Sequence, residues 1–283
     1  MNKAEFTKIL IRIKTEFENC ITTKIFDKKT YDNGNKAKEA FIRSQKLICY
    51  LHDYIKKQFI NTGINPNKIN PPYGQNSPEI TLSGFLKTKN QDICILSDNI
   101  ETIYGETIQD GPLKGTVDQI TAKVMDTSIS INIRSQLSSL AKNFDTLYER
   151  TFAEALNLHI RAPKMCLAEV YLIPTQEYND ETMKKNKVSF KKTTNLEKYI
   201  LEFQAINNRS VISGEDYKYE RVFLAMVDFQ CNPPKLYSDV EELKKDGYIN
   251  SNSTVSMDGL TINNFVNDVL DKYTQRNDIK LLK

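Results

Sequence analysis

The sequence predicts a mixed α/β protein in which helices flank a central sheet of parallel and antiparallel strands, with further helices at both ends of the chain. Apolar runs rich in β-branched residues occupy 91–96, 128–135, 165–173 and 221–229, and runs of this kind are typical of strands. A helical pattern over 136–159 connects two of them. A strand, helix and strand of this length favour a parallel pair with a right-handed crossover.

Helical periodicity is clearest in the first 60 residues. Residues 4–20 carry apolar side chains at helical spacing, and a second helix is predicted over 36–59, after the break at Asn33-Gly34-Asn35. His52 lies on this second helix, and we interpret it as structural because no ligand partner is near it in the sequence. The segment 62–77, which is rich in Pro and Gly, is expected to be an irregular connector.

An antiparallel hairpin is expected next, from strands over 79–86 and 91–96 joined by a polar turn over 87–90. Asp92 then lies at the edge of an apolar run. The polar, Gly-containing stretch 97–115 is expected to be an excursion from the sheet.

The strand that begins near Ser128 has two different faces. Ile129, Ile131 and Ile133 alternate with polar residues, so one face is predicted to join the core and the other to form a polar site. The polar side chains are those of Ser130, Asn132, Arg134 and Gln136.

The last third of the chain alternates polar segments with short elements. After the strand 165–173, a polar and basic segment extends from 174 to 194, and a short helix is predicted over 196–206. A capping box over 238–241 precedes another short helix, and an amphipathic helix over 261–273 is expected to close the chain.

Several classes of function lack their sequence motifs. The chain has no GxxxxGK[ST] or GxGxxG loop, no HExxH or GxSxG motif, and only two histidines, His52 and His159.

The five cysteines form no CxxC pair and are expected to be buried free thiols. No run approaches the roughly 20 apolar residues of a membrane helix, and the N-terminus lacks the apolar segment of a signal peptide, so we expect a cytoplasmic protein without a membrane partner. A net charge of +3, from 39 basic and 36 acidic residues, neither indicates nor excludes nucleic-acid binding.

Among the kinds of site considered, one remains, in which carboxylates bind a hard cation. Mg²⁺ prefers oxygen ligands and needs only one or two protein carboxylates near a phosphate. Asp92 is the first candidate ligand, and the second is expected from Glu149 or Glu154 on the long helix or from Glu169 inside the apolar strand. Because a lone buried Glu is costly, an ion pair with Arg or Lys is an equally supported interpretation of Glu169.

These residues carry a resemblance. The segments GFLKTKNQDICIL and INIRSQLSSLAKNFDTLYERTFAEALNLH, with the order of elements around them, resemble the nuclease core of type II restriction endonucleases of the PD-(D/E)xK superfamily. The resemblance covers roughly residues 36–173, and further on only the strand 221–229. It implies a restriction-endonuclease-like fold in a single nuclease domain over 1–283, with N-terminal helices in 1–62, a catalytic core in 79–173, and sheet completion, DNA recognition and C-terminal helices in 174–283.

The resemblance also implies a site. Asp92 corresponds to the metal-binding Asp of the first half-motif, with Gln91 where Pro usually stands. The second half-motif falls on Asn132-Ile133-Arg134 or Arg134-Ser135-Gln136, and neither contains the expected Glu. In some members this Glu lies on the following helix. The preferred site is therefore Asp92 and Glu149 on Mg²⁺, with Arg134 and Gln136 orienting water or phosphate. Lys142 could neutralise charge on the phosphate, or could equally be a solvent-facing helix residue.

The function implied is Mg²⁺-dependent, sequence-specific hydrolysis of double-stranded DNA by a homodimer, in a restriction-modification system whose methyltransferase is encoded separately. Lys87 and Lys89 would hold the DNA backbone near the metal, unless they form an ordinary charged hairpin tip. The segments 97–115 and 178–194 would reach the bases, or are plain surface loops. The second segment carries a basic cluster that would bind phosphates, or is a solvated loop: Lys184, Lys185, Lys187, Lys191 and Lys192.

Two alternatives remain open. Because the Glu-x-Lys pattern is missing, the chain could be a DNA-binding or regulatory protein with a degenerate nuclease core. It could also be an unrelated α/β interaction domain in which Asp92 and the polar helix face are structural.

Overall fold

A six-stranded mixed sheet is the centre of the protein, in a computed structural model that describes residues 1–137, 140–192 and 195–283, with the backbone alone for 141–144. The strand order is β14-β13-β10-β9-β6-β3. The strands β9, β10 and β13 are parallel, whereas β6 is antiparallel to β9, β3 to β6, and β14 to β13. The predicted mixed α/β fold is therefore confirmed. The sheet strands are β3 (Ile69–Asn70), β6 (Ile93–Ile95), β9 (Ile129–Ser135), β10 (Cys166–Pro174), β13 (Arg221–Asp228) and β14 (Lys235–Leu236).

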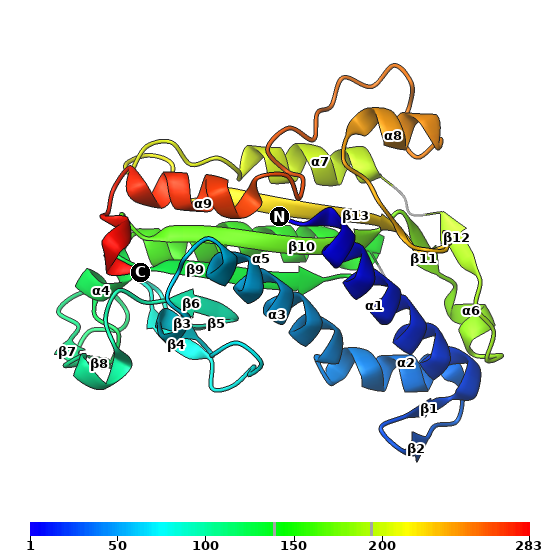
Figure 1. Cartoon of the computed structure of the whole chain (residues 1–283), viewed down its shortest axis with the longest axis horizontal. Coiled ribbons are helices and arrows are strands. Elements are labelled where there is room, and N and C mark those ends of the chain that lie inside the picture. Colours follow the sequence, from blue (N-terminus) through cyan, green and yellow to red (C-terminus); the bar gives the residue numbers. More distant parts are fainter. Residues whose placement is uncertain (138–139, 193–194) are drawn as a thin grey trace.

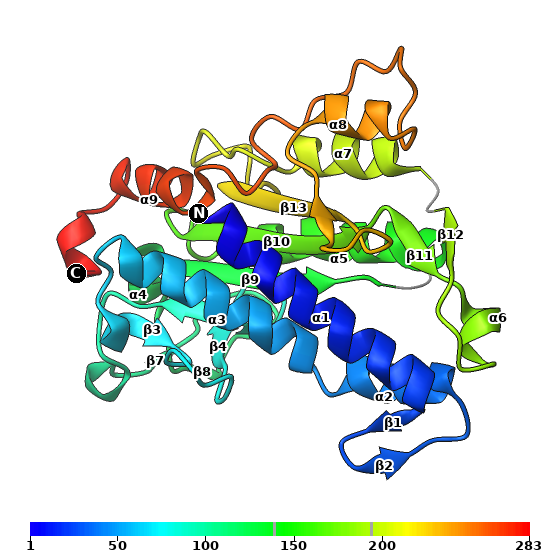
Figure 2. The ribbon, with the colours of Figure 1, turned by 45° about the vertical axis from the view of Figure 1, so that its right-hand side comes forward.

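Helices cover both faces of the sheet (Figures 1 and 2). One core lies between the sheet and the N-terminal helices α1 (Lys3–Thr23), α2 (Gly34–Arg43) and α3 (Lys46–Asn61), joined by the C-terminal helix α9 (Phe265–Thr274). The second core lies under α5 (Leu140–His159), with α4 (Ala122–Asp126), α7 (Leu196–Ala205) and α8 (Val240–Lys245) beside it. None of the described helices is both long and apolar enough to cross a bilayer.

The alternation of side chains along β9 sorts them onto these two faces. Ile129, Ile131 and Ile133 are buried in the first core, while Asn132 and Arg134 point toward α5, where they contact its side chains. This confirms the predicted apolar and polar faces. The neighbouring strand β10 alternates in the same way, so its Glu169 lies beside Asn132 in the register of the sheet.

The hairpin before β6 differs from the prediction. Its strands are β4 (Ile80–Ser83) and β5 (Thr88–Gln91), which form a separate two-stranded sheet. The residues 87–90, expected to be the turn, therefore mostly belong to β5, and after β3 the chain returns to the main sheet only at β6. Asp92 lies between β5 and β6, so it occupies the point where the chain leaves one sheet for the other.

The helix predicted over 36–59 is two helices. Gln45 adopts a left-handed conformation (φ 59°) between α2 and α3. The hydroxyl of Ser44 donates to the carbonyl of Phe41 and accepts from the amide of Lys46. A side chain bonded to the backbone in this way competes with helical hydrogen bonds, and the apolar periodicity that predicted one helix does not report such local competition.

Three segments expected to be irregular contain short elements, and the connector 62–77 is one of them because it includes the sheet strand β3. The basic segment forms a hairpin of β11 (Gln176–Tyr178) and β12 (Phe190–Lys192), with α6 (Asp180–Met183) at its end. The excursion after β6 contains the pair β7 (Glu106–Thr107) and β8 (Val117–Asp118). A further small hairpin, β1 (Ile25–Phe26) and β2 (Lys29–Thr30), connects α1 to α2, and the one-turn helices are η1 (Pro66–Lys68), η2 (Ile100–Thr102) and η3 (Ile279–Leu281).

Gly34 sets the distance between the first two helices. A Cβ atom at this position would overlap the backbone carbonyl of Ile21 in α1. We therefore expect Gly34→Ala to lower the free energy of unfolding by about 1–3 kcal/mol, because overpacking against backbone is relieved only by moving a helix. Urea denaturation measures the change. Lys36→Ala, at an exposed position of the same helix, is the control, and equal stability of the two variants would contradict this account.

Candidate functional site

Asp92 is held where the backbone ladder between β6 and β9 stops. The last paired residues are Ile93 and Ile131, and beyond them the Oδ2 atom of Asp92 accepts a hydrogen bond from the amide of Ile133 at 2.6 Å. The carboxylate thus substitutes for a backbone acceptor. Burial raises the pKa of Asp92 to about 6, although the Ile133 amide opposes this shift.

Glu154 of α5 accepts hydrogen bonds from three side chains on the neighbouring strands. Its Oε1 atom accepts from Asn132 Nδ2 at 3.2 Å, and its Oε2 atom accepts from Arg134 Nη2 at 2.7 Å and from Lys89 Nζ at 3.0 Å. Arg134 also donates to the hydroxyl of Thr151, one turn earlier on the helix. The site therefore joins β5, β9 and α5 through charged side chains.

Glu169 completes this cluster from β10. Its side chain is fully buried, and Oε1 lies 3.4 Å from Arg134 Nη1. This is the close contact with an Arg that one of the two interpretations of Glu169 expected. Neither carboxyl oxygen has a hydrogen-bond partner among the described residues. Burial raises the pKa of Glu169 to about 8, with Arg134 opposing the shift and Glu154 and Asp92 adding to it.

His52 reaches the same place from α3. Its Nε2 atom lies 3.8 Å from Oδ1 of Asp92, and the ring is buried without a hydrogen bond from the described residues. Burial, assisted by Lys56, lowers the pKa of His52 to about 4, so the ring is neutral near pH 7. The sequence indicated a structural role for His52 and did not connect it with Asp92, because contacts between a helix and a distant strand leave no local pattern.

The candidate residues on and before α5 lie in different environments. Glu149 is exposed, and no described contact joins it to Asp92. Gln136 is buried and accepts from the hydroxyls of Tyr171 and Tyr199, which ties the end of β9 to α7. The side chain of Lys142 lies outside the described part of the chain.

Helix geometry separates the two glutamates of α5. Residues five positions apart on an α-helix point about 140° away from each other. Glu154 lies three residues after buried Thr151 and four before buried Leu158, so the 3.6-residue period assigns it, rather than Glu149, to the covered face. The preference for Glu149 followed the family's spacing instead of this period, which is the local signal that distinguishes the two residues.

The predicted DNA-binding lysines fall into two groups. Lys89 is engaged by Glu154, whereas Lys87 is exposed in the turn between β4 and β5. The five lysines of the basic segment are exposed between the end of α6 and the end of β12. The elements β11, α6 and β12 extend beyond the ends of β9 and β10 (Figures 1 and 2). Lys184 is paired with Glu181 at 2.7 Å and Lys191 lies 3.8 Å from Glu177.

The described residues include no group of three or more His, Cys, Asp or Glu side chains placed to hold a metal ion. The cluster instead combines the carboxyl groups of Asp92, Glu154 and Glu169 with the cations of Arg134 and Lys89. Such an arrangement fits either a buried ion network or an anion-binding site that also retains an acidic group.

Comparison with known proteins adds no relative. The chain matches no protein-family model, no curated protein and no solved structure.

The raised pKa of Glu169 makes stability depend on pH. Between about pH 4.5 and pH 8 the unfolded chain carries this carboxyl ionised while the folded chain keeps it protonated. The folded state therefore binds more protons, and its stability falls as pH rises. We expect wild type to lose up to about 1.4 kcal/mol per pH unit relative to Glu169→Gln across this range.

Urea unfolding at about pH 5, 6, 7 and 8 measures that difference. Glu149→Gln, at an exposed position of α5, is the control and should follow the wild-type pH profile. Parallel profiles for wild type and Glu169→Gln would show that Glu169 is ionised in the folded protein throughout the range.

Proposed function

We propose that this chain is a Mg²⁺-dependent endonuclease that hydrolyses double-stranded DNA at specific sequences. The observation that carries the proposal is the position of Asp92, whose carboxylate is hydrogen-bonded into β9 beside Asn132 and Arg134. The two segments that resemble the PD-(D/E)xK half-motifs are thus adjacent in space, although about 40 residues separate them in the chain.

The order of elements supports the same proposal. A helix precedes β6, antiparallel β9 follows, and α5 connects β9 to the parallel strand β10. Apart from the hairpin, whose second strand is β5 instead of β6, this is the succession that the resemblance implies. Asn132 and Arg134 stand at the positions of the expected Glu and Lys, and carboxylates from the neighbouring β10 and α5 meet at that point.

Asp92 and Glu169 are the pair best suited to hold Mg²⁺. One or two protein carboxylates suffice for this ion, because it keeps several waters and also binds substrate phosphate. Glu169 contributes two buried oxygens without hydrogen bonds from the described residues, and both residues have pKa values raised by burial. A bound cation would favour their ionised forms. Both oxygens of Glu154, by contrast, already accept hydrogen bonds.

The protein groups have separate tasks in such a reaction. When bound, the metal would polarise the phosphoryl oxygen and lower the pKa of a coordinated water. The Ile133 amide fixes the orientation of Asp92, and Glu154 fixes those of Arg134 and Lys89. These two cations are suited to neutralise negative charge that develops on the phosphate.

The ion pairs of Arg134 favour a second candidate, a DNA-binding or regulatory protein that does not cleave. Arg134 contacts both Glu154 and Glu169, so the buried carboxyl groups already have a cationic partner without a metal. In this alternative the cluster is structural, and the exposed lysines alone contact DNA.

DNA binding in either case is assigned to the basic hairpin β11–α6–β12. Its lysines would contact phosphates, and homodimerisation would match the two-fold symmetry of a palindromic site. A restriction-modification role, with a separate methyltransferase, belongs to the same proposal.

The decisive experiment is cleavage of plasmid and phage DNA in the presence of Mg²⁺ or EDTA. We expect discrete fragments with Mg²⁺ and none with EDTA, and we expect Asp92→Ala to abolish cleavage while DNA binding persists. Glu169→Gln should reduce cleavage by about a hundredfold or more, as expected for loss of a group that supports the transition state. Mn²⁺ binding, followed by electron paramagnetic resonance, should weaken in both variants.

Glu149→Ala provides the matched control on the exposed face of α5. Loss of cleavage in Glu149→Ala with full activity in Glu169→Gln would return the second ligand to Glu149. Retarded but intact DNA under every condition would support the non-cleaving alternative.

The basic hairpin generates its own prediction. Lys185 and Lys187 are exposed near its end, so Lys185→Ala/Lys187→Ala should weaken binding to DNA of any sequence. The slope of log affinity against log salt concentration should become less steep by up to about two, one for each phosphate that the variant no longer neutralises. Fluorescence anisotropy over a salt series measures it. An equal effect of Lys280→Ala/Lys283→Ala would contradict a specific role for the hairpin.

A further inference from the structure

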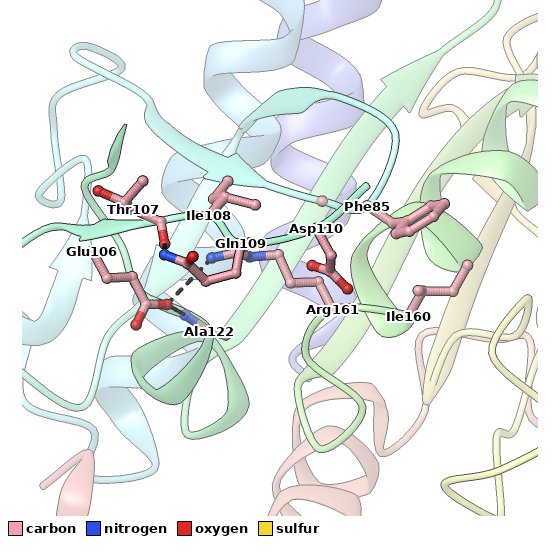
Figure 3. A pocket seen from close by; sticks show the side chains of 10 residues that line it. Phe85, Glu106, Thr107, Ile108, Gln109, Asp110, Ala122, Ile160 and Arg161 are labelled. Atoms are coloured by element: carbon pink, nitrogen blue, oxygen red, sulfur yellow. Dashed lines mark hydrogen bonds and ion pairs between the residues drawn. The ribbon is translucent and has the colours of Figure 1, made fainter. Parts of the chain in front are cut away.

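A pocket of about 360 Å³ lies beside the hairpin β4–β5 (Figure 3), and no residue of the carboxylate cluster lines it. It is formed by the end of β4, the segment from β7 onward, and the end of α5. The size is within the range of small-ligand sites. The proposed hydrolysis of DNA at Asp92 does not use it.

One wall of the pocket is apolar and exposed. The ring of Phe85 and the side chain of Ile160 lie on the same side of the pocket (Figure 3), with exposed fractions of 37% and 47%. Gly111, which has a positive φ of 69°, lies so close to this ring that a Cβ atom would be 3.0 Å from it. Gly111 therefore packs closely against one edge of the ring, while the side chain stays partly exposed. An accessible ring of this kind is suited to stack on a flat partner.

The rest of the lining is mostly polar, with more acidic than basic groups, and Asp110 lies between Arg161 and the apolar side chains (Figure 3). Arg161 is paired with Asp118 at 2.6 Å and with Glu106 at 3.3 Å, so its charge is already matched. Asp110 is exposed, and no described residue donates a hydrogen bond to its carboxylate. Such a wall repels phosphate but accepts hydrogen bonds from amino groups.

The pocket and the carboxylate cluster share one rigid support. Asn157 of α5 accepts from the amides of Leu86 and Lys87 and donates to the carbonyl of Lys87. Glu154, one turn earlier on the same helix, binds Lys89 of the same hairpin. A ligand in the pocket would therefore be held at a set position relative to Asp92 and its neighbours.

We infer that this pocket binds one DNA base that carries an amino group, and that it excludes thymine. A base in a closed duplex cannot enter a concave pocket, so the base must be turned out of the stack. Phe85 stacks on its face, and Asp110 accepts a hydrogen bond from its exocyclic amino group. This inference rests on the proposed DNA substrate and adds a specificity-determining subsite to it.

Ligand-observed NMR with single nucleosides tests the pocket without any cleavage. The probes are deoxycytidine, deoxyadenosine and thymidine, together with deoxycytidine monophosphate, mixed with the whole protein in EDTA. We expect saturation transfer to the base protons of deoxycytidine, deoxyadenosine or both, and none to thymidine. The monophosphate should bind no more tightly than deoxycytidine, because the wall is acidic.

Variants locate the binding. Phe85→Ala should weaken it by about tenfold or more, as expected for loss of one stacking partner, and Asp110→Asn should remove the preference over thymidine. Tyr73→Ala and Asp32→Asn change an exposed ring and a carboxylate outside the pocket, and should bind as wild type does.

Two outcomes would overturn the inference: no nucleoside binds, or binding is unchanged in Phe85→Ala and Asp110→Asn. Asp92→Ala separates this question from catalysis. If that variant binds nucleosides while wild type does not cleave DNA, the pocket is supported and the proposed hydrolysis is not. If wild type cleaves DNA but binds no nucleoside, the proposed hydrolysis is supported and the inference about the pocket is overturned.

Discussion

The contact of Arg134 with two buried carboxylates, Glu154 and Glu169, is the interaction on which the candidate site depends. A guanidinium remains charged at any physiological pH, and a buried charge without a partner is severely destabilising. Strand β9, strand β10 and helix α5 must therefore keep positions that preserve both contacts. A rotation of α5 that removed Glu154 would leave Arg134 and Lys89 without their shared partner.

The site lies where two structural layers meet. The apolar face of β9 packs on the N-terminal helices, and its polar face meets α5. Because β6 is short, the sheet lacks a backbone partner beside Ile133, and Asp92 supplies one from its side chain. His52 then comes close to Asp92 from the other layer. A truncated strand thus makes a carboxylate accessible to both faces of the sheet.

The charges of the cluster determine what it is able to do. Three carboxyl groups and two cations occupy one small region, and burial keeps Glu169 protonated near neutral pH. Binding of a cation would require that proton to leave and would compete with Arg134 for the carboxylate. The same residues therefore either bind a metal ion or remain in their contacts with Arg134. A direct measurement of metal binding distinguishes the proposed nuclease from the non-cleaving DNA-binding protein better than a measurement of stability does.

The arrangement of the main strands followed from local patterns. Alternation over 128–135 predicted the two faces of β9, and the spacing of apolar runs predicted β10 and β13, because side-chain period and burial are coupled in a strand. The same reasoning gave wrong predictions in two other places. Ser44 and Gln45 break a helix within a continuous apolar pattern, and Thr88–Gln91 pairs as a strand despite its polar composition.

By itself the sequence determined that Asp92 ends a polar segment next to a buried strand, and that a polar strand face and several glutamates were available to accompany it. Only the tertiary structure decided that Glu154 and Glu169 both contact Arg134 and that Lys89 joins them. The physical reason is that the rotation of α5 and the register of β10 are set by packing against residues distant in the chain. No local pattern records contacts of that range.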